Sequence, residues 1–133
     1  MGRPFLQYVK DGSAKYICRC CSCDVASMSG LVWQGVMGAA RQPAVLLRDS
    51  VNLEPASEPR SERLSSGRYT LVDMCCRGCA TVLGWRYKEA KNLEEKYKEG
   101  CTLLQISLLS FVEAEKPDVD MHPASQHTVA VRC

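Results

Sequence analysis

Long apolar runs and an excess of either charge are both missing from this 133-residue sequence. No stretch approaches the roughly 18 consecutive apolar residues of a membrane-spanning helix, and the first residues contain no apolar signal segment. Lys and Arg number 17 against 15 Asp and Glu, and the formal net charge of +2 is too small to indicate an acidic partner by electrostatics alone. We therefore expect a soluble intracellular protein without direct membrane or nucleic-acid contacts.

Histidine is scarce, and lipidation motifs are missing too. The two histidines, His122 and His127, have no partner at metal-ligand spacing and lie in a region with little apolar periodicity. Leu6 stands where myristoylation needs Ser or Thr, and Cys133 is the last residue, whereas prenylation needs a cysteine fourth from the end. We therefore expect neither histidine-bound metal nor a lipid anchor.

Cysteine, by contrast, is abundant. The chain has nine cysteines, most of them in two tight clusters, at 18–23 and 75–79. The odd count and the clustering favour metal binding in a reducing compartment over a disulfide framework. With no second hydrophobic block, the chain supports a single domain that would contain both clusters.

Each cluster contains a C-x2-C pair, a spacing that lets the backbone turn so that both sulfurs face one cation. The two pairs consist of Cys18, Cys21, Cys76 and Cys79. Gly78, inside the second pair, is free to take a positive φ. Together the pairs predict a Zn²⁺ site with four thiolates and no open position, which is structural and not catalytic. Spacing alone leaves Cys20 and Cys23 as a rival first pair.

The other cysteines have simpler interpretations. Cys75 precedes Cys76 on a predicted strand, so its side chain should point to the opposite face. Cys101 is expected to pack in the core. Cys133 has no predicted role.

The distribution of β-branched and aromatic residues predicts a mainly β domain. Residues 43–47 form a compact apolar run typical of a buried strand. Residues 68–72 and 81–87 flank the second cysteine pair and form the predicted centre of the sheet. The long apolar block at 101–112 is interpreted as one closing strand.

Two polar segments interrupt this pattern. Residues 54–66 contain prolines, serines and alternating charges, and we expect an exposed excursion or hairpin tip there. Residues 88–99 are strongly charged, with apolar residues at helix-like spacing before Gly100, and predict a short helical or turn segment.

An ordered set of motifs now identifies a resemblance. The motifs are M-G-R-x-F (Met1 to Phe5), Y-x-C-x-x-C (Tyr16 to Cys21), a strand ending in V-N (Ala44 to Asn52), C-x-x-C with G-W-R-Y (Cys76 to Tyr87) and K-Y-K-E-G (Lys96 to Gly100). Over about residues 1–110 the chain resembles the yippee-like family. The family pattern places a tyrosine two residues before its first ligand, so the resemblance selects Cys18 and Cys21 over the rival pair.

The resemblance implies a β-tent fold, in which two antiparallel sheets meet at an angle and are pinned by a zinc ion on four cysteines. It implies a zinc-binding yippee-type domain over residues 1–112. Residues 113–133 are expected to form a disordered C-terminal tail, because they contain two prolines and an acidic run without apolar periodicity.

The function expected from this resemblance is that of a non-catalytic interaction module in the nucleus and cytoplasm. Its partner would be a protein, with a peptide or small molecule as a further ligand. Trp85 and Tyr87 share one face of a strand, and Trp33 is expected to join them in an aromatic ligand-binding surface. The plainer alternative is that Trp85 is a core residue.

Two other functions stay open. The Cys-Cys-x-Gly-Cys form of the second pair also resembles centromere-licensing proteins, in which a yippee-type domain serves oligomerisation and centromere recruitment. The second alternative is an enzyme similar to methionine sulfoxide reductases, for which Cys101 is the candidate nucleophile. Because Cys101 lacks an acid–base partner in the sequence, we expect no enzymatic activity.

Overall fold

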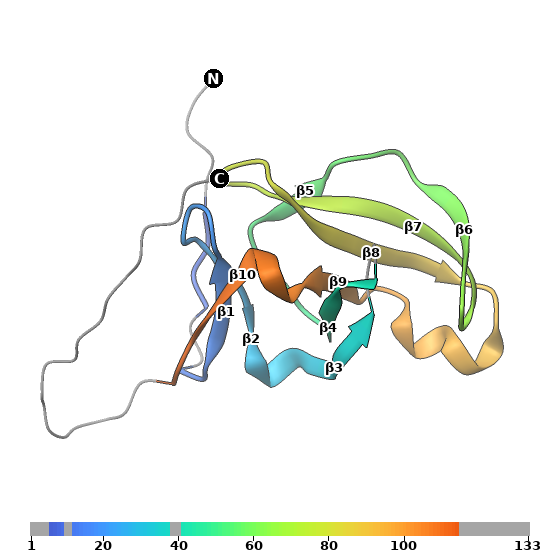
Figure 1. The fold of residues 1–133 in the computed structure, drawn as a ribbon, viewed down its shortest axis with the longest axis horizontal. Coiled ribbons are helices and arrows are strands. Elements are labelled where there is room, and N and C mark those ends of the chain that lie inside the picture. The colour runs from blue at the N-terminus through green and yellow to red at the C-terminus, as the bar shows by residue number, and fades with distance from the viewer. Residues whose placement is uncertain (1–5, 10–11, 38–40, 115–133) are drawn as a thin grey trace, which may run out of the picture.

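The fold is given by a computed structural model that describes residues 6–9, 12–37 and 41–114. It consists of strands and short 3₁₀ helices (η) (Figure 1). In chain order they are β1 (Lys15–Cys18), β2 (Asp24–Ser27), η1 (Met28–Gly30), β3 (Leu31–Met37), β4 (Pro43–Leu47), β5 (Leu53–Pro55), β6 (Arg60–Leu64), β7 (Gly67–Cys76), β8 (Val82–Ala90), η3 (Leu93–Lys98), β9 (Thr102–Gln105), η4 (Ile106–Leu108) and β10 (Leu109–Val112). Within the described ranges, no helix could cross a membrane.

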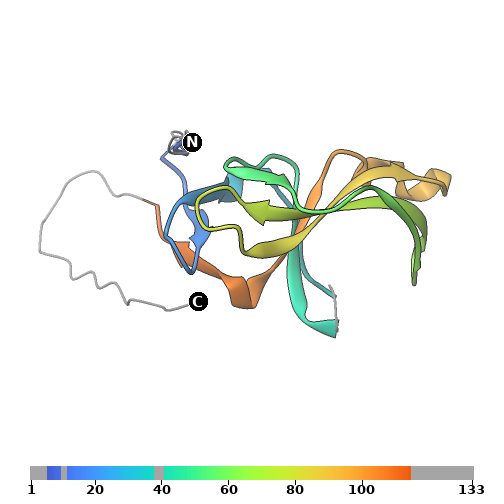
Figure 2. The same cartoon turned by 90° about the horizontal axis from the view of Figure 1, so that it is seen from above.

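The strands form two antiparallel sheets, as the sequence predicts. The smaller sheet has the order β10-β1-β2, and the larger has the order β3-β4-β9-β8-β7-β5, with β6 also paired to β7. Figure 1 shows the three-stranded sheet at one end of the molecule, and Figure 2 shows how the long strands β7 and β8 curve away from it. The mainly β, two-sheet expectation is therefore confirmed.

The chain passes between the sheets through two 3₁₀ helices. η1 joins β2 to β3, and η4 joins β9 to β10. The prediction of one closing strand over 101–112 is therefore wrong, because β9 belongs to the larger sheet and β10 to the smaller. The apolar pattern does not reveal the break, since Ile106 and Leu108 within η4 pack against the core as strand residues would.

The polar segments match the expectation in part. Within 54–66, β5 pairs with the end of β7 and β6 with its beginning, so this part of the chain forms edge strands and a hairpin. Along β6 the exposed and half-buried residues alternate, which explains its polar sequence. Of the segment 88–99, the first residues extend β8 and only Leu93–Lys98 forms the predicted helical turn.

β10 ends at Val112, where the sequence places the end of the domain. That boundary stays a prediction. Most of the predicted tail lies outside the described residues, and with it His122, His127 and Cys133.

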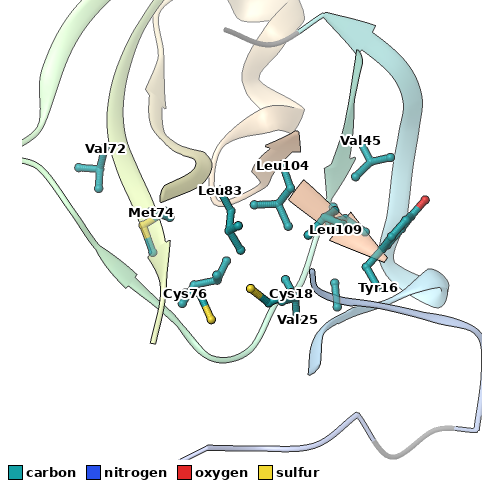
Figure 3. Close-up of a cluster of buried hydrophobic side chains, with 13 residues drawn as sticks. Tyr16, Cys18, Val25, Val45, Val72, Met74, Cys76, Leu83, Leu104 and Leu109 are labelled. Atoms are coloured by element: carbon teal, nitrogen blue, oxygen red, sulfur yellow. The ribbon is translucent and has the colours of Figure 1, made fainter. Parts of the chain in front are cut away.

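Two groups of buried side chains lie on opposite faces of the larger sheet. β4 shows this directly, because its residues 44–47 are all buried and point alternately to the two faces. One group, here called the inter-sheet core, lies between the two sheets (Figure 3) and consists of Tyr16, Cys18, Val25, Ala26, Val45, Leu47, Leu53, Val72, Met74, Cys76, Leu83, Leu104 and Leu109. The other, here called the far-face core, consists of Ala44, Leu46, Tyr69, Leu71, Trp85, Tyr87, Ala90, Cys101 and Leu103.

Candidate metal centre and aromatic cavity

The two predicted cysteine pairs meet at the edge of the inter-sheet core. The Sγ atoms of Cys18, Cys21, Cys76 and Cys79 all lie within 4.8 Å of one another. Cys18 and Cys79 are 3.6 Å apart, and Cys21 and Cys76 are 3.5 Å apart. Four sulfurs about 2.3 Å from one zinc ion would be about 3.8 Å from each other. The four thiols are therefore spaced to hold one tetrahedral metal ion.

The two pairs are formed by equivalent turns. Cys18 ends β1 and its carbonyl accepts a 2.8 Å hydrogen bond from Ser22, while Cys76 ends β7 and its carbonyl accepts a 2.7 Å bond from Ala80. Ser22 and Ala80 both have φ of 67°. This shared geometry places the first pair at Cys18 and Cys21, and it leaves Cys20 outside the four-sulfur cluster.

Gly78 is required for space and not for backbone conformation. Although a glycine is free to take a positive φ, Gly78 is not among the residues with that conformation. A Cβ at Gly78 would instead lie 2.9 Å from Cys21 Sγ, and its N–H donates a 3.3 Å hydrogen bond to Cys76 Sγ. The glycine therefore lets the thiols of the opposite pair approach the turn.

Burial raises the pKa of the Cys18 and Cys21 thiols and raises that of Cys76 to about 12. Burial acts on Cys79 in the same direction, but hydrogen bonds with Thr81, Cys18 and Cys21 outweigh it and lower its pKa to about 7. Three of the four thiols therefore keep their protons at neutral pH unless a cation stabilises the thiolates. A four-thiol set without another ligand position fits a structural zinc ion.

The remaining cysteines differ in their surroundings. Cys20 Sγ accepts a hydrogen bond from Thr81 at 3.7 Å. Cys75 is buried but is not part of the inter-sheet core. Cys101 is 3% exposed, its thiol donates to the Tyr97 carbonyl at 3.5 Å, and burial raises its pKa. This environment disfavours the thiolate that a nucleophile requires.

Cys23 is the residue that the sequence did not assign. Its Sγ lies 3.3 Å from Cys76 Sγ, and burial raises its pKa to about 11. The competing C-x2-C spacing was the only sequence signal for this proximity.

The aromatic residues predicted for ligand binding divide into two groups. Trp33 is 52% exposed and, together with Tyr87, lines a cavity of about 390 Å³. Trp85 does not line this cavity and is 9% exposed within the far-face core, with its ring centroid 6.4 Å from that of Tyr87. The complete lining of the cavity is Trp33, Leu46, Leu64, Ser65, Ser66, Tyr87, Tyr97, Lys98 and Leu103.

A lysine of the chain occupies the faces of three tyrosine rings at this cavity. Lys98 Nζ lies 5.2, 5.6 and 5.9 Å from the ring centroids of Tyr69, Tyr87 and Tyr97. These distances are within the range of cation–π attraction. The sequence did not reveal this arrangement, because Lys98 belongs to a charged segment that resembles a solvated surface.

The Lys98 ammonium is also fully hydrogen-bonded. It contacts Glu95 at 2.9 Å, the Tyr69 hydroxyl at 3.1 Å and Ser66 Oγ at 3.2 Å, which can engage all three of its protons. Burial lowers the pKa of Lys98, but Glu95 and Tyr69 raise it more, so it is raised overall. The cation therefore stays charged and links η3 to the β6–β7 turn and β7.

Comparison with known proteins connects this geometry to a family. Residues 14–124 match the family model described as "Yippee zinc-binding/DNA-binding /Mis18, centromere assembly". Protein yippee-like 3 of Homo sapiens is 30% identical over 106 residues, which cover 79% of this chain and 87% of the relative. Protein yippee of Drosophila melanogaster is 32% identical over 113 residues, which cover 85% and 91%.

The fold has a solved counterpart. The crystal structure described as the Mis18 'Yippee-like' domain is similar with a TM-score of 0.59 at 15% identity, over 77% of this chain and 98% of that chain. Both cysteine pairs lie within the residues that the family model matches. The chain therefore belongs to the yippee/Mis18 family.

Proposed function

We propose that this chain is a non-catalytic interaction module whose two sheets are joined by one structural zinc ion on Cys18, Cys21, Cys76 and Cys79. The observation that carries the proposal is the position of the four thiols. One pair begins at the last residue of β1 in the smaller sheet, and the other begins at the last residue of β7 in the larger sheet. An ion at this position would fix the angle between the sheets and leave no coordination position for substrate.

The ligand site of the module would be the cavity beside Trp33 and Tyr87. Its walls are mainly apolar and aromatic, and two serines and Lys98 add polar groups. Such lining is typical of sites for small molecules or single side chains of a peptide. Because Lys98 already occupies the tyrosine faces, the site suits a flat uncharged group better than an external cation.

Two matched variants test the ligand site. N-acetyltryptophanamide would be titrated into the zinc-loaded protein while chemical shifts are followed, with tetramethylammonium as the cationic probe. We expect saturable shifts around Trp33 and Leu103 with the neutral probe, lost in Trp33→Ala and kept in Phe111→Ala. Phe111 is the appropriate control because it is 51% exposed, against 52% for Trp33, but lies on the smaller sheet. Equal shifts with both probes, or shifts clustered away from the cavity, would contradict the proposal.

The zinc component is tested by elemental analysis of the purified protein, for which we expect one zinc per chain. An intact fold without metal after strong chelation would exclude the structural role.

The family description includes DNA binding, but the net charge of +2 gives this chain no electrostatic preference for nucleic acid. Protein, peptide or small-molecule partners are therefore proposed, in the nucleus and cytoplasm, which microscopy of the tagged chain would test.

Oligomerisation with recruitment to centromeres is the second candidate. It is supported by the family description and by the similarity to the Mis18 domain. In addition, each sheet has an edge strand with an exposed aromatic residue, Trp33 on β3 and Phe111 on β10. Edge strands of this kind can pair with another chain. Sedimentation velocity would test self-association, and a monomer that shows no centromere signal in cells would exclude this candidate.

The enzyme alternative is disfavoured by the burial and raised pKa of Cys101. We propose that the chain does not reduce methionine sulfoxide. Reduction of a methionine sulfoxide substrate that is abolished by Cys101→Ser would show the opposite.

A further inference from the structure

A fifth cysteine sulfur, that of Cys23, contacts the four-sulfur cluster of the candidate metal centre. Cys23 Sγ is 3.3 Å from Cys76 Sγ, which is slightly closer than Cys21 Sγ at 3.5 Å. The Cys23 thiol also interacts with the Cys21 thiol. The fifth sulfur is therefore placed against a predicted ligand and not against an unrelated group.

The backbone fixes Cys23 in this position. Ile17 on β1 pairs with Asp24 on β2, and the Cys18 N–H donates a 2.9 Å hydrogen bond to the Cys23 carbonyl. Cys23 directly precedes β2, and this hydrogen bond holds it opposite Cys18 at the end of β1. The turn that presents Cys18 to the metal therefore presents Cys23 to it as well.

The opposite turn leaves room for both candidate sulfurs. A Cβ at Gly78 would lie 2.9 Å from Cys21 Sγ and 3.5 Å from Cys23 Sγ. The absence of this one carbon therefore accommodates two thiols, either of which can approach Cys76.

We propose that Cys23 is an exchangeable metal ligand that replaces Cys21, so that the centre can bind its ion through Cys18, Cys23, Cys76 and Cys79. This inference rests on the metal centre of the proposed function. In the exchange, Cys23 loses its thiol proton as Cys21 gains one, so the ion keeps four thiolates and the total charge is unchanged. Cys18 is not replaced in this way, because it is fully buried in the inter-sheet core whereas Cys21 is exposed.

The exchange gives the exposed ligand a substitute. Cys21 is the most accessible of the four thiols and would be the first to react with an alkylating or oxidising reagent. With Cys23 available, loss of Cys21 would leave the two sheets joined through the metal. The site would then tolerate damage at its surface while remaining sensitive to loss of Cys18.

The test compares Cys21→Ser, Cys23→Ser and the double variant, with Cys75→Ser as the control cysteine outside the cluster. Metal per chain would be measured by elemental analysis, and the thiolate count by the charge-transfer absorption of the cobalt-substituted protein. Each single variant is expected to bind one metal ion with a four-thiolate spectrum. The double variant should lose one thiolate and bind cobalt at least about tenfold more weakly than either single variant.

The outcomes separate this inference from the proposed function. Wild-type protein without metal would overturn both. Wild-type protein with one metal ion, together with a Cys21→Ser variant that has three thiolates or no metal, would overturn the role of Cys23 alone. A double variant that behaves like Cys21→Ser would overturn it as well.

Alkylation of zinc-loaded wild-type protein covers the case in which Cys21→Ser does not fold. Mass mapping after limiting iodoacetamide treatment should find the label on Cys21 or on Cys23, but not on both in one metal-bound chain. Metal-bound chains with both residues labelled would contradict the exchange.

Discussion

The two faces of the larger sheet carry cores of different design. The inter-sheet core is enclosed by both sheets, is mostly aliphatic and ends at the cysteine cluster. The far-face core contains three large aromatic rings and is open at a cavity that Trp33 borders. The first core depends on connections between distant parts of the chain, and the second is stabilised by ring packing and a partly buried ammonium group. We therefore expect the first to determine whether the domain folds and the second to determine what it binds.

Removal of a metal ligand should have the largest effect on stability, and it should distinguish the inter-sheet core from the far-face core most clearly. Structural zinc contributes on the order of 10 kcal/mol to small domains, and net stabilities are about 5–15 kcal/mol. Cys18→Ser or Cys76→Ser should therefore abolish cooperative unfolding in calorimetry. The matched control is Cys101→Ser, a buried cysteine of the far-face core, for which we expect a loss of about 1–2 kcal/mol. Equal losses in the two regions would contradict the distinction.

Gly84→Ala should damage both cores together. A Cβ at Gly84 would lie 1.8 Å from the Leu103 carbonyl oxygen, a backbone atom that cannot move without separating β8 from β9. We expect a loss of about 3 kcal/mol or more by chemical denaturation. In Gly78→Ala the new methyl group meets the movable Cys21 thiol instead, so weaker metal binding should exceed the loss of sheet stability. A Gly84→Ala variant with unchanged stability would contradict this expectation and show that β8 and β9 can separate at this point.

Adjacent leucines of β9 allow a direct comparison of the two faces. Leu104 is completely buried in the inter-sheet core, and Leu103 is 4% exposed beside the cavity. Substitution of either by Ala should cost about 2–5 kcal/mol, with Leu104→Ala at the upper end because its site is enclosed. Only Leu103→Ala should weaken binding of N-acetyltryptophanamide. If Leu104→Ala weakened binding equally, the two faces would not be independent.

The smallest effect is expected for Lys98→Met, which removes the charge but keeps a long apolar side chain. The lost cation–π and hydrogen-bond contacts should cost about 1–2 kcal/mol at pH 7. Because the folded-state pKa of Lys98 is raised, its contribution is complete below the unfolded value of about 10.4 and is lost as the pH rises through the folded value. Denaturation curves of wild type and variant should therefore converge at strongly alkaline pH.

The same variant provides a test of specificity. With the tyrosine rings vacated, Lys98→Met should gain binding of tetramethylammonium, which wild type should lack. Arg63→Met is a suitable control, since Arg63 is exposed on β6 and is not part of the cavity lining.

Sequence reasoning succeeded where a local pattern determines the outcome. The C-x2-C spacings, together with the family resemblance, predicted which four sulfurs converge, and the compact run at 43–47 predicted a buried strand. It failed where the outcome depends on pairing between distant segments. The position of Cys23 follows from the register of β1 against β2, and the division of 101–112 follows from the second sheet. Trp33 and Tyr87 share a cavity because β3 and β8 belong to one curved sheet, which no local pattern specifies.

The position of β1 has a consequence for the order of assembly during synthesis. β1 lies between β2, which follows it directly, and β10, whose Val112 pairs with Lys15. While the chain emerges from the ribosome, one edge of β1 must stay unpaired until almost the whole domain has been made. The second cysteine pair emerges earlier than β10, so a metal ion could join the halves before the last strand arrives. Zinc supply during translation would then influence how long that open edge is exposed to aggregation.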